Sequence, residues 1–307
     1  MKSLLIIISI SCFSLVANSQ SKFLKTGTIG EVSKTKKENE NKRLYGPVDY
    51  RDFSEMVGED FVIMPKIKSV QHYGYQLIYK EGSSGMDNVS YKEGLGLVLK
   101  LKSFEGIQGI FQDSLGNRYT TKAYNNQFSD LAPLRDLNEA AKLYLHQYLW
   151  LKERSLSTYD EGTDEYGSIP VDKLTRVKVE DIVVGTEEQK PVRFILKTST
   201  GKIGYIDVNM SGSNQSYQYR KFYSFYSSFW TFDPKLRYKY SSSIWNLIAK
   251  SDVRLGMTAQ QVKMSLGEPD NVNYSTYKSG SHEQWVYGED SSKTYYYFEN
   301  GILTAQN

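Results

Sequence analysis

Between Tyr45 and about Met210 the sequence is a succession of short apolar or alternating runs separated by turn residues. The clearest runs lie at 61–64, 75–79, 97–102 and 193–207. Alternation with a period of two, bounded by Gly, Ser and Asp, predicts antiparallel β hairpins. This pattern constrains the fold more than any other feature, because it makes β structure the framework of the larger part of the chain.

Parts of this region resemble one another. Residues 99–104 parallel 177–182, and 61–64 could match 148–151. A Ser-x-Gly turn followed by a tyrosine occurs at 114–119 and again at 199–205. A duplicated β unit explains this likeness, and so does chance similarity among alternating strands, so the region contains one or two small β units.

Helical spacing interrupts the strands twice. One predicted helix runs from 134 to about His146, after a capping side chain at Ser129 or Asp130 and a proline near its first turn. Its apolar face is formed by Leu134, Leu137, Ala141 and Leu145. A second helix is predicted at 222–230, where five aromatic residues share one face: Phe222, Phe225, Tyr226, Phe229 and Trp230. Such a stripe is more often core than a ligand platform.

The N-terminus predicts export. A basic start, an apolar run at 4–16 and small residues at 17–19 form a secretory signal peptide, since a membrane span needs about 18 or more apolar residues. The only cysteine, Cys12, lies inside that run and is not placed as a lipid-anchor cysteine. The mature chain therefore has no disulfide and no thiolate metal site, and its stability must come from its core.

Charge and composition limit the classes of partner. The chain has 38 basic and 35 acidic residues, a balance that does not predict nucleic acid or an anionic membrane surface as partner. No apolar run follows the signal, so no transmembrane span is expected, while peripheral association with the outer membrane stays open. The 25 tyrosines fit a β protein of the cell envelope or a carbohydrate-binding protein.

Residues 252–306 carry the densest local signals. Thr258 and Gln261 form a capping box for a short helix, which Gly267 ends. Another short helix at 244–249 follows a capping serine at 242 or 243.

Two strands at 283–287 and 294–299 lead into Asn300-Gly301, the strongest short hairpin signal. A two-residue turn would place Phe298 opposite Leu303, and Tyr296 opposite Ala305, on a core face. We predict that the other face is solvated or meets a partner, through Tyr295, Tyr297, Ile302 and Thr304.

Five motifs in this segment resemble, in order and spacing, the SmpA/OmlA family of BamE-like outer-membrane proteins. They are Leu-Gly-Met-Thr at 255–258, Val262, Leu-Gly-x-Pro at 266–269, Gln-Trp-x-Tyr at 284–287 and Tyr-Phe-x-Asn-Gly-x-Leu at 297–303. The resemblance covers only residues 252–306. It implies two helices against a small antiparallel sheet, in non-enzymatic proteins that bind partners of the β-barrel assembly machinery. Family members are usually small lipoproteins, whereas this chain is long and has no usable anchor cysteine.

The predicted fold class is therefore α+β. A mostly antiparallel β N-terminal region precedes a small BamE-like domain of two short helices on an antiparallel sheet. The expected division is a signal peptide at 1–19, a flexible leader at 20–44, a β-rich unit at 45–130, a helix with a second β-rich unit and the aromatic helix at 131–240, and the C-terminal domain at 241–307.

No catalytic, cofactor-binding or metal-binding residues are predicted, because the three histidines are scattered and no nucleophile motif occurs. The expected function is non-enzymatic binding of an unidentified protein partner, in the periplasm, at the outer membrane or after secretion. The alternative is a secreted glycan-binding or carbohydrate-active protein, or an inhibitor-like binder. A carbohydrate site would expose Tyr or Trp side chains in a concave region beside two carboxylates.

Overall fold

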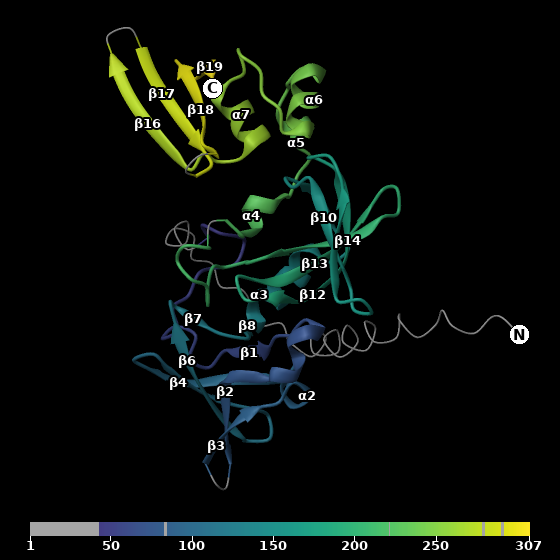
Figure 1. The fold of residues 1–307 in the computed structure, drawn as a ribbon, viewed down its shortest axis with the longest axis vertical. Coiled ribbons are helices and arrows are strands. Elements are labelled where there is room, and N and C mark those ends of the chain that lie inside the picture. The colour runs from purple at the N-terminus through teal and green to yellow at the C-terminus, as the bar shows by residue number, and fades with distance from the viewer. Residues whose placement is uncertain (1–42, 83–84, 221, 278–279, 290–291) are drawn as a thin grey trace, which may run out of the picture. The chain divides into compact units, whose positions relative to one another are not determined.

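The computed structural model describes residues 43–82, 85–220, 222–277, 280–289 and 292–307. The predicted signal peptide with Cys12, and all but the end of the predicted leader, lie outside these residues. The described chain forms two compact units (Figure 1). The first contains the described residues up to Tyr148, together with Leu156–Ile169 and Val177–Ser228. The second contains Leu149–Ser155, Pro170–Arg176 and Phe229–Asn307.

The fold class predicted from the sequence is wrong. Strands account for 45% and helices for 18% of the described residues, in three antiparallel sheets of four to eight strands. The chain is therefore mostly β, and it does not end in a small BamE-like domain of two helices on one sheet. The sequence underestimated the sheets because a polar strand such as β16 (Asn271–Tyr277) has no apolar period to reveal it.

The first unit holds an eight-stranded antiparallel sheet in the order β3-β2-β6-β5-β4-β1-β8, with β7 beside β6. Its strands are β1 Asp60–Ile63, β2 Tyr75–Gly82, β3 Gly85–Val89, β4 Val98–Glu105, β5 Gln108–Gln112, β6 Arg118–Tyr124, β7 Gln127–Phe128 and β8 Leu131–Pro133. Two short helices, η2 (Lys68–Tyr73) and α2 (Tyr91–Gly94), lie between strands. Alternate side chains such as Phe61, Leu99 and Phe111 are fully buried and form its core, as the period of two predicts.

Five strands of a second sheet follow the order β11-β10-β14-β13-β12. They are β10 Ser155–Asp160, β11 Glu165–Pro170, β12 Arg176–Glu187, β13 Lys190–Thr198 and β14 Ile203–Val208. The strands β3-β2-β6-β5-β4 of the first sheet have the same arrangement, in which a hairpin lies beside the last strand of a three-stranded meander. The segments that parallel one another in the sequence therefore fall on strands with equivalent places.

The chain leading into β9 (Tyr148–Leu151) extends this correspondence. The His146 amide donates to the Val179 carbonyl of β12, and the Val179 amide donates to the Gln147 carbonyl, each at 2.9 Å. In the first sheet β1 pairs with β4 in the equivalent way, with Phe61 opposite Leu99.

The predicted helix between the strands is α3 (Leu134–Tyr144), which ends two residues early. Its first turn has no side-chain cap. Asp130 lies before the helix in the left-handed backbone region, with φ 60°, and forms an ion pair with Lys66 instead. On the predicted apolar face Leu137 is buried and the other three residues are half-buried.

The predicted aromatic helix at 222–230 is wrong. Only α4 (Phe225–Ser228) is helical, and β15 (Phe229–Trp230) follows at once, with Phe229 opposite Leu151 of β9. Phe225 and Phe229 are buried, whereas Phe222 is 63% exposed. Aromatic residues favour strands over helices, so pairing with a neighbouring strand overrides the helical spacing.

The second unit contains α5 (Pro234–Arg237), α6 (Ser242–Lys250), α7 (Ala259–Leu266) and a four-stranded sheet. The sheet strands follow sequence order: β16 Asn271–Tyr277, β17 Gly280–Tyr287, β18 Thr294–Glu299 and β19 Ile302–Gln306. The cap of α6 is Ser241, not the predicted Ser242 or Ser243. The capping box of α7 is confirmed, because Thr258 and Gln261 make both reciprocal bonds.

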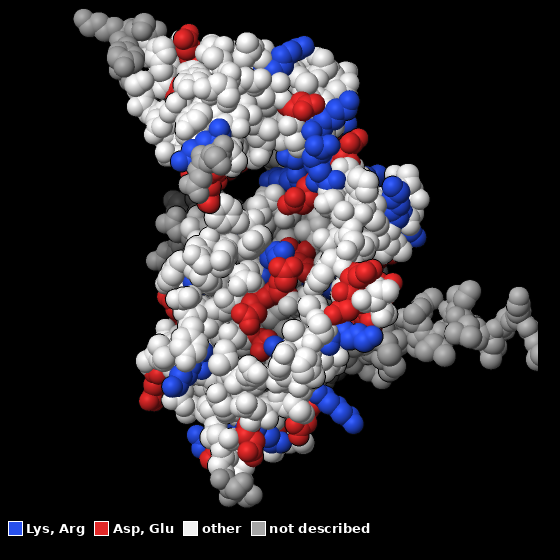
Figure 2. All heavy atoms as spheres, in the orientation of Figure 1, with Lys and Arg blue, Asp and Glu red and all other residues white. Residues whose placement is uncertain are grey.

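Across the part of the chain that the structure describes, no helix combines the length and the apolar character needed to cross a membrane. Figure 2 shows that most of the visible face carries neither acidic nor basic side chains, and that the charged side chains gather in several small groups.

Candidate functional site

The four-stranded sheet of the second unit carries the residues that were predicted to meet a partner. One side of the sheet packs into the core of the unit, where the Trp285 and Phe298 rings lie 4.2 Å apart and join Val262 of α7. The opposite side is called the outer face below. Because the helices α6 and α7 contribute to the first side, a partner would meet the outer face or an edge of the sheet.

The Asn300-Gly301 turn forms as predicted, with φ 51° and 76°, which is the geometry that favours Asn-Gly in a two-residue hairpin. Phe298 lies opposite Leu303, as predicted. The predicted pair of Tyr296 with Ala305 is wrong, because a bulge shifts the register and places Tyr297 opposite Ala305. A bulge adds one residue to a strand without a local sequence signal.

The bulge decides where the four predicted residues lie. Tyr295 and Tyr297 alternate along β18 toward the outer face and are half-buried, and Ile302 and Thr304 of β19 are exposed. Thr304 is the additional residue of the bulge, and its Oγ1 donates to the Tyr297 carbonyl at 3.2 Å. The four residues therefore belong to one hairpin, but they do not form a broad aromatic platform.

A row of polar side chains crosses the outer face. The Asn273 Nδ2 donates to the Gln284 Oε1 at 2.9 Å, and the Gln284 Nε2 donates to the Tyr297 hydroxyl at 3.2 Å. The row joins β16, β17 and β18 through cross-strand pairs. Such side-chain pairs stabilise a sheet much as side-chain pairs four residues apart stabilise a helix.

The two tyrosines of the inner side are structural. The Tyr287 hydroxyl donates to the Gly267 carbonyl at 2.9 Å, where α7 ends. Burial raises the pKa of Tyr287 and of Tyr296, so both phenols stay neutral at physiological pH. They pack edge to face, with ring centroids 5.4 Å apart.

The two edges of the sheet differ. The edge of β19 is paired with the segment before α7: the Gly256 amide donates to the Leu303 carbonyl at 2.8 Å, and the Leu303 amide donates to the Met257 carbonyl at 2.9 Å. No described element of the unit pairs with the outer edge of β16. An unpaired edge presents a row of amides and carbonyls that can bond to another strand.

The composition of β16 is unusual for an edge strand. Edges are commonly blocked by charge or proline, and the edge strands of the first unit follow this rule with Asp87 in β3, Pro133 in β8 and Glu165 in β11. The strand β16 reads Asn-Val-Asn-Tyr-Ser-Thr-Tyr, without charge or proline. Its register with β17 is unbroken, and Tyr274 is 73% exposed.

Sequence reasoning missed β16, although it is the accessible edge of the sheet. The available signal was weak: a run of β-branched and aromatic residues mixed with asparagine, following the helix-ending Gly267. Within the described ranges no three His, Cys, Asp or Glu side chains gather as a metal site would require.

No family model, no curated protein and no solved structure matches this chain. The resemblance of residues 252–306 to the SmpA/OmlA family therefore stays a prediction from its five motifs.

Proposed function

We propose that this chain is an exported, non-enzymatic protein of the cell envelope that binds a partner protein through the sheet of its second unit. The proposed contact is a strand of the partner added to the edge of β16. The proposal is carried by the contrast between the two edges of the sheet. The edge of β16 is uncharged and unbulged, and no described strand pairs with it, whereas the edge of β19 is paired.

Strand addition takes its affinity from main-chain hydrogen bonds and its specificity from side chains on the two faces. On β16 the exposed side chains are amides, a hydroxyl and the Tyr274 ring, so the partner strand is expected to be polar and uncharged at this contact. The Asn273–Gln284–Tyr297 row holds β16 in place as a template. The motifs that resemble the SmpA/OmlA family add support, since its members bind partner proteins.

Export rests on the apolar run at 4–16, which lies outside the described residues. Fractionation of cells that express the chain tests this part alone. Recovery of the protein in the cytoplasm, with residues 1–19 still attached, would contradict export and leave the β16 contact to be judged separately.

Photo-crosslinking in intact cells tests the contact. A photoreactive residue at Ser275, in β16, is expected to give a discrete protein adduct, and the same residue at Leu115, in the turn between β5 and β6, is expected to give none. Tyr274→Lys places a charge on the edge and is expected to abolish the adduct, whereas Leu115→Lys, at a position 86% exposed in the first unit, is not. An equal adduct from both positions, or one that survives Tyr274→Lys, would refute the proposal.

A further inference from the structure

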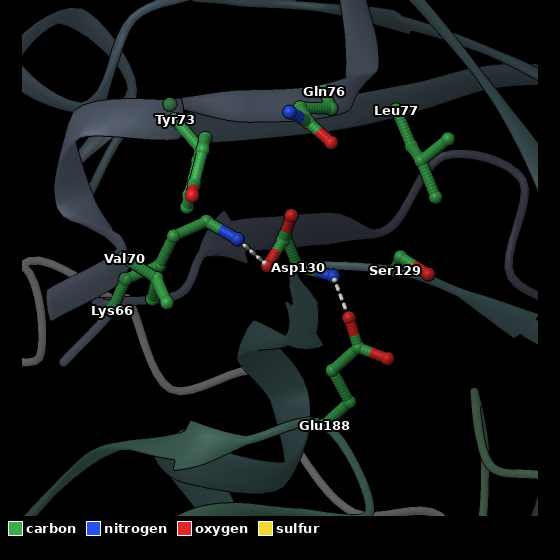
Figure 3. A pocket seen from close by; sticks show the side chains of 9 residues that line it. Lys66, Val70, Tyr73, Gln76, Leu77, Ser129, Asp130 and Glu188 are labelled. Carbon is green, nitrogen blue, oxygen red and sulfur yellow. Dashed lines mark hydrogen bonds and ion pairs between the residues drawn. The ribbon is translucent and has the colours of Figure 1, made fainter.

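An open pocket lies on the first unit (Figure 3). Its volume is about 380 Å³, and its lining includes Lys66, Tyr73, Gln76, Asp130 and Glu188. This volume falls within the range of roughly 300–1,000 Å³ that small-ligand sites occupy. The lining comes from η2 and the segment before it, from β2, from the loop before β8 and from the turn between β12 and β13.

An irregularity of β2 builds one wall. Gly74, before the strand, has φ 63°, and a Cβ there would lie 2.7 Å from the Val89 carbonyl oxygen. Tyr75 pairs with Val89, but the next pair is Tyr79 with Asn88, so three residues of β2 bulge from the ladder. The bulge exposes Gln76 and Leu77 at the pocket. Such bulges recur beside functional sites, where they redirect side chains.

The polar part of the pocket is held in place by its own contacts. The Lys66 Nζ lies 2.6 Å from the Asp130 Oδ1, and the Asp130 amide donates to the Glu188 Oε1 at 2.9 Å (Figure 3). The Gln215 Nε2 donates to the Glu188 carbonyl at 2.7 Å and fixes the turn. Burial raises the pKa of Glu188, although the Asp130 amide and Lys66 favour its charged form. Groups ordered before binding lose little entropy when a ligand arrives.

A second hollow shares the lining residue Leu77 with the first. It has a volume of about 230 Å³. Its other lining residues include Tyr79, Gln108, Lys122 and Tyr124. We call the two hollows together the β2 groove.

Three tyrosines of the β2 groove expose their rings. Tyr73 is 59%, Tyr79 is 37% and Tyr124 is 52% exposed. The Tyr73 ring is supported by the His72 ring, whose centroid lies 3.8 Å away. An open aromatic face offers a surface for the apolar face of a sugar ring, and the carboxylates and the Gln76 and Gln108 amides offer acceptors and donors for its hydroxyls.

The charges of the β2 groove compensate one another. Its lining includes two ammonium groups, Lys66 and Lys122, and two carboxylates, Asp130 and Glu188. The net charge is zero, which favours an uncharged ligand over an anion or a cation. A peptide strand would need a free sheet edge, whereas β2 and β6 lie inside the sheet with strands on both sides.

We propose that the β2 groove binds an uncharged oligosaccharide, with sugar rings against Tyr73, Tyr79 and Tyr124 and hydroxyls bonded to Asp130, Glu188 and Gln76. The proposal is independent of partner binding at β16, because all the residues it uses belong to the first unit.

Binding of the full chain to a panel of neutral and charged oligosaccharides tests this. The panel contains linear glucose, xylose and N-acetylglucosamine oligomers, with heparin and polygalacturonate fragments as charged probes, and isothermal calorimetry measures the affinities. At least one neutral oligomer is expected to bind, with little dependence on salt. Tyr73→Ala and Tyr124→Ala are each expected to weaken binding roughly 2- to 12-fold, the loss of one ring contact. Glu188→Gln is expected to weaken binding about tenfold or more, because an ionised acceptor is lost.

The matched control is Tyr166→Ala in β11, which removes a tyrosine that is 54% exposed and does not line the β2 groove. It is expected to leave glycan affinity unchanged. Far-UV circular dichroism of every variant verifies folding. Failure of all neutral oligomers to bind, preference for a charged probe, or equal affinity of the wild type and Tyr73→Ala would each overturn the proposal.

Discussion

Replacing the buried Asp136 by asparagine should change how the stability of the first unit depends on pH. Asp136 lies in the first turn of α3 and is 1% exposed. The Ser211 hydroxyl donates to its Oδ2 at 2.7 Å, and the Arg135 guanidinium lies 3.6 Å from its Oδ1, which has no hydrogen-bond partner. Burial outweighs these contacts and raises the pKa of Asp136 from 3.8 to about 6.

The sign and the size of the effect on the free energy of unfolding follow from this shift in pKa. A carboxyl whose pKa is higher in the folded than in the unfolded chain binds its proton more tightly when folded. Its contribution to stability is complete below pH about 4 and is lost as the pH rises through about 6. A shift of about two units corresponds to about 3 kcal/mol. The asparagine amide of Asp136→Asn does not titrate, so the variant does not lose this stability as the pH rises.

Urea unfolding at several pH values between about 4 and about 8 measures the effect. All four tryptophans lie in the second unit. Far-UV circular dichroism therefore follows the whole chain, while indole fluorescence follows the second unit alone and serves as a control. The difference in unfolding free energy between Asp136→Asn and the wild type should move by about 3 kcal/mol in favour of the variant as the pH rises. If the unfolding free energies of the wild type and the variant change in parallel with pH, the raised pKa of Asp136 is refuted.

Three further substitutions test other parts of the structure by urea unfolding. Thr258→Ala removes the capping box of α7 and should lower the stability of the second unit by about 1 kcal/mol, whereas Thr304→Ala, at an exposed position of β19, should not. Phe298→Ala leaves a cavity beside Trp285 and should cost about 3–5 kcal/mol with a change in indole fluorescence; an unchanged spectrum would contradict the packing. Asp207→Ala leaves the buried Arg193 guanidinium without the carboxylate that it meets at 2.7 Å and should cost about 3–5 kcal/mol, while the double change Arg193→Met with Asp207→Leu should recover most of it.

The local signals of the sequence were reliable where a few neighbouring residues determine the conformation. The Thr258–Gln261 box and the Asn300-Gly301 turn form because their hydrogen bonds and backbone angles involve residues only one to three positions apart. The same reasoning failed at 222–230, where five aromatic residues fit a helix but β15 pairs with a distant strand. Pairing partners far away in the sequence cannot be read from local spacing.

Neither candidate site could be predicted from local sequence signals, and the reasons are physical. The strand β16 is an edge, so few of its side chains are buried and no apolar period marks it. The β2 groove joins Lys66, Asp130 and Glu188, and every pair of these residues is separated by 58 or more positions in the sequence. The tyrosine content of the sequence predicted a carbohydrate site as an alternative, with exposed rings beside two carboxylates. The residues that would form such a site could be identified only from the fold.

Hydrogen exchange at β16 tests the central proposal most directly. In the free protein the outward amides of β16 should exchange without protection, while the Leu303 amide of β19, bonded to the Met257 carbonyl at 2.9 Å, should be protected. Addition of the partner recovered by crosslinking should protect β16 and leave Leu303 unchanged. Protection of every β16 amide in the free protein, or no change at β16 when the partner binds, would contradict strand addition at this edge.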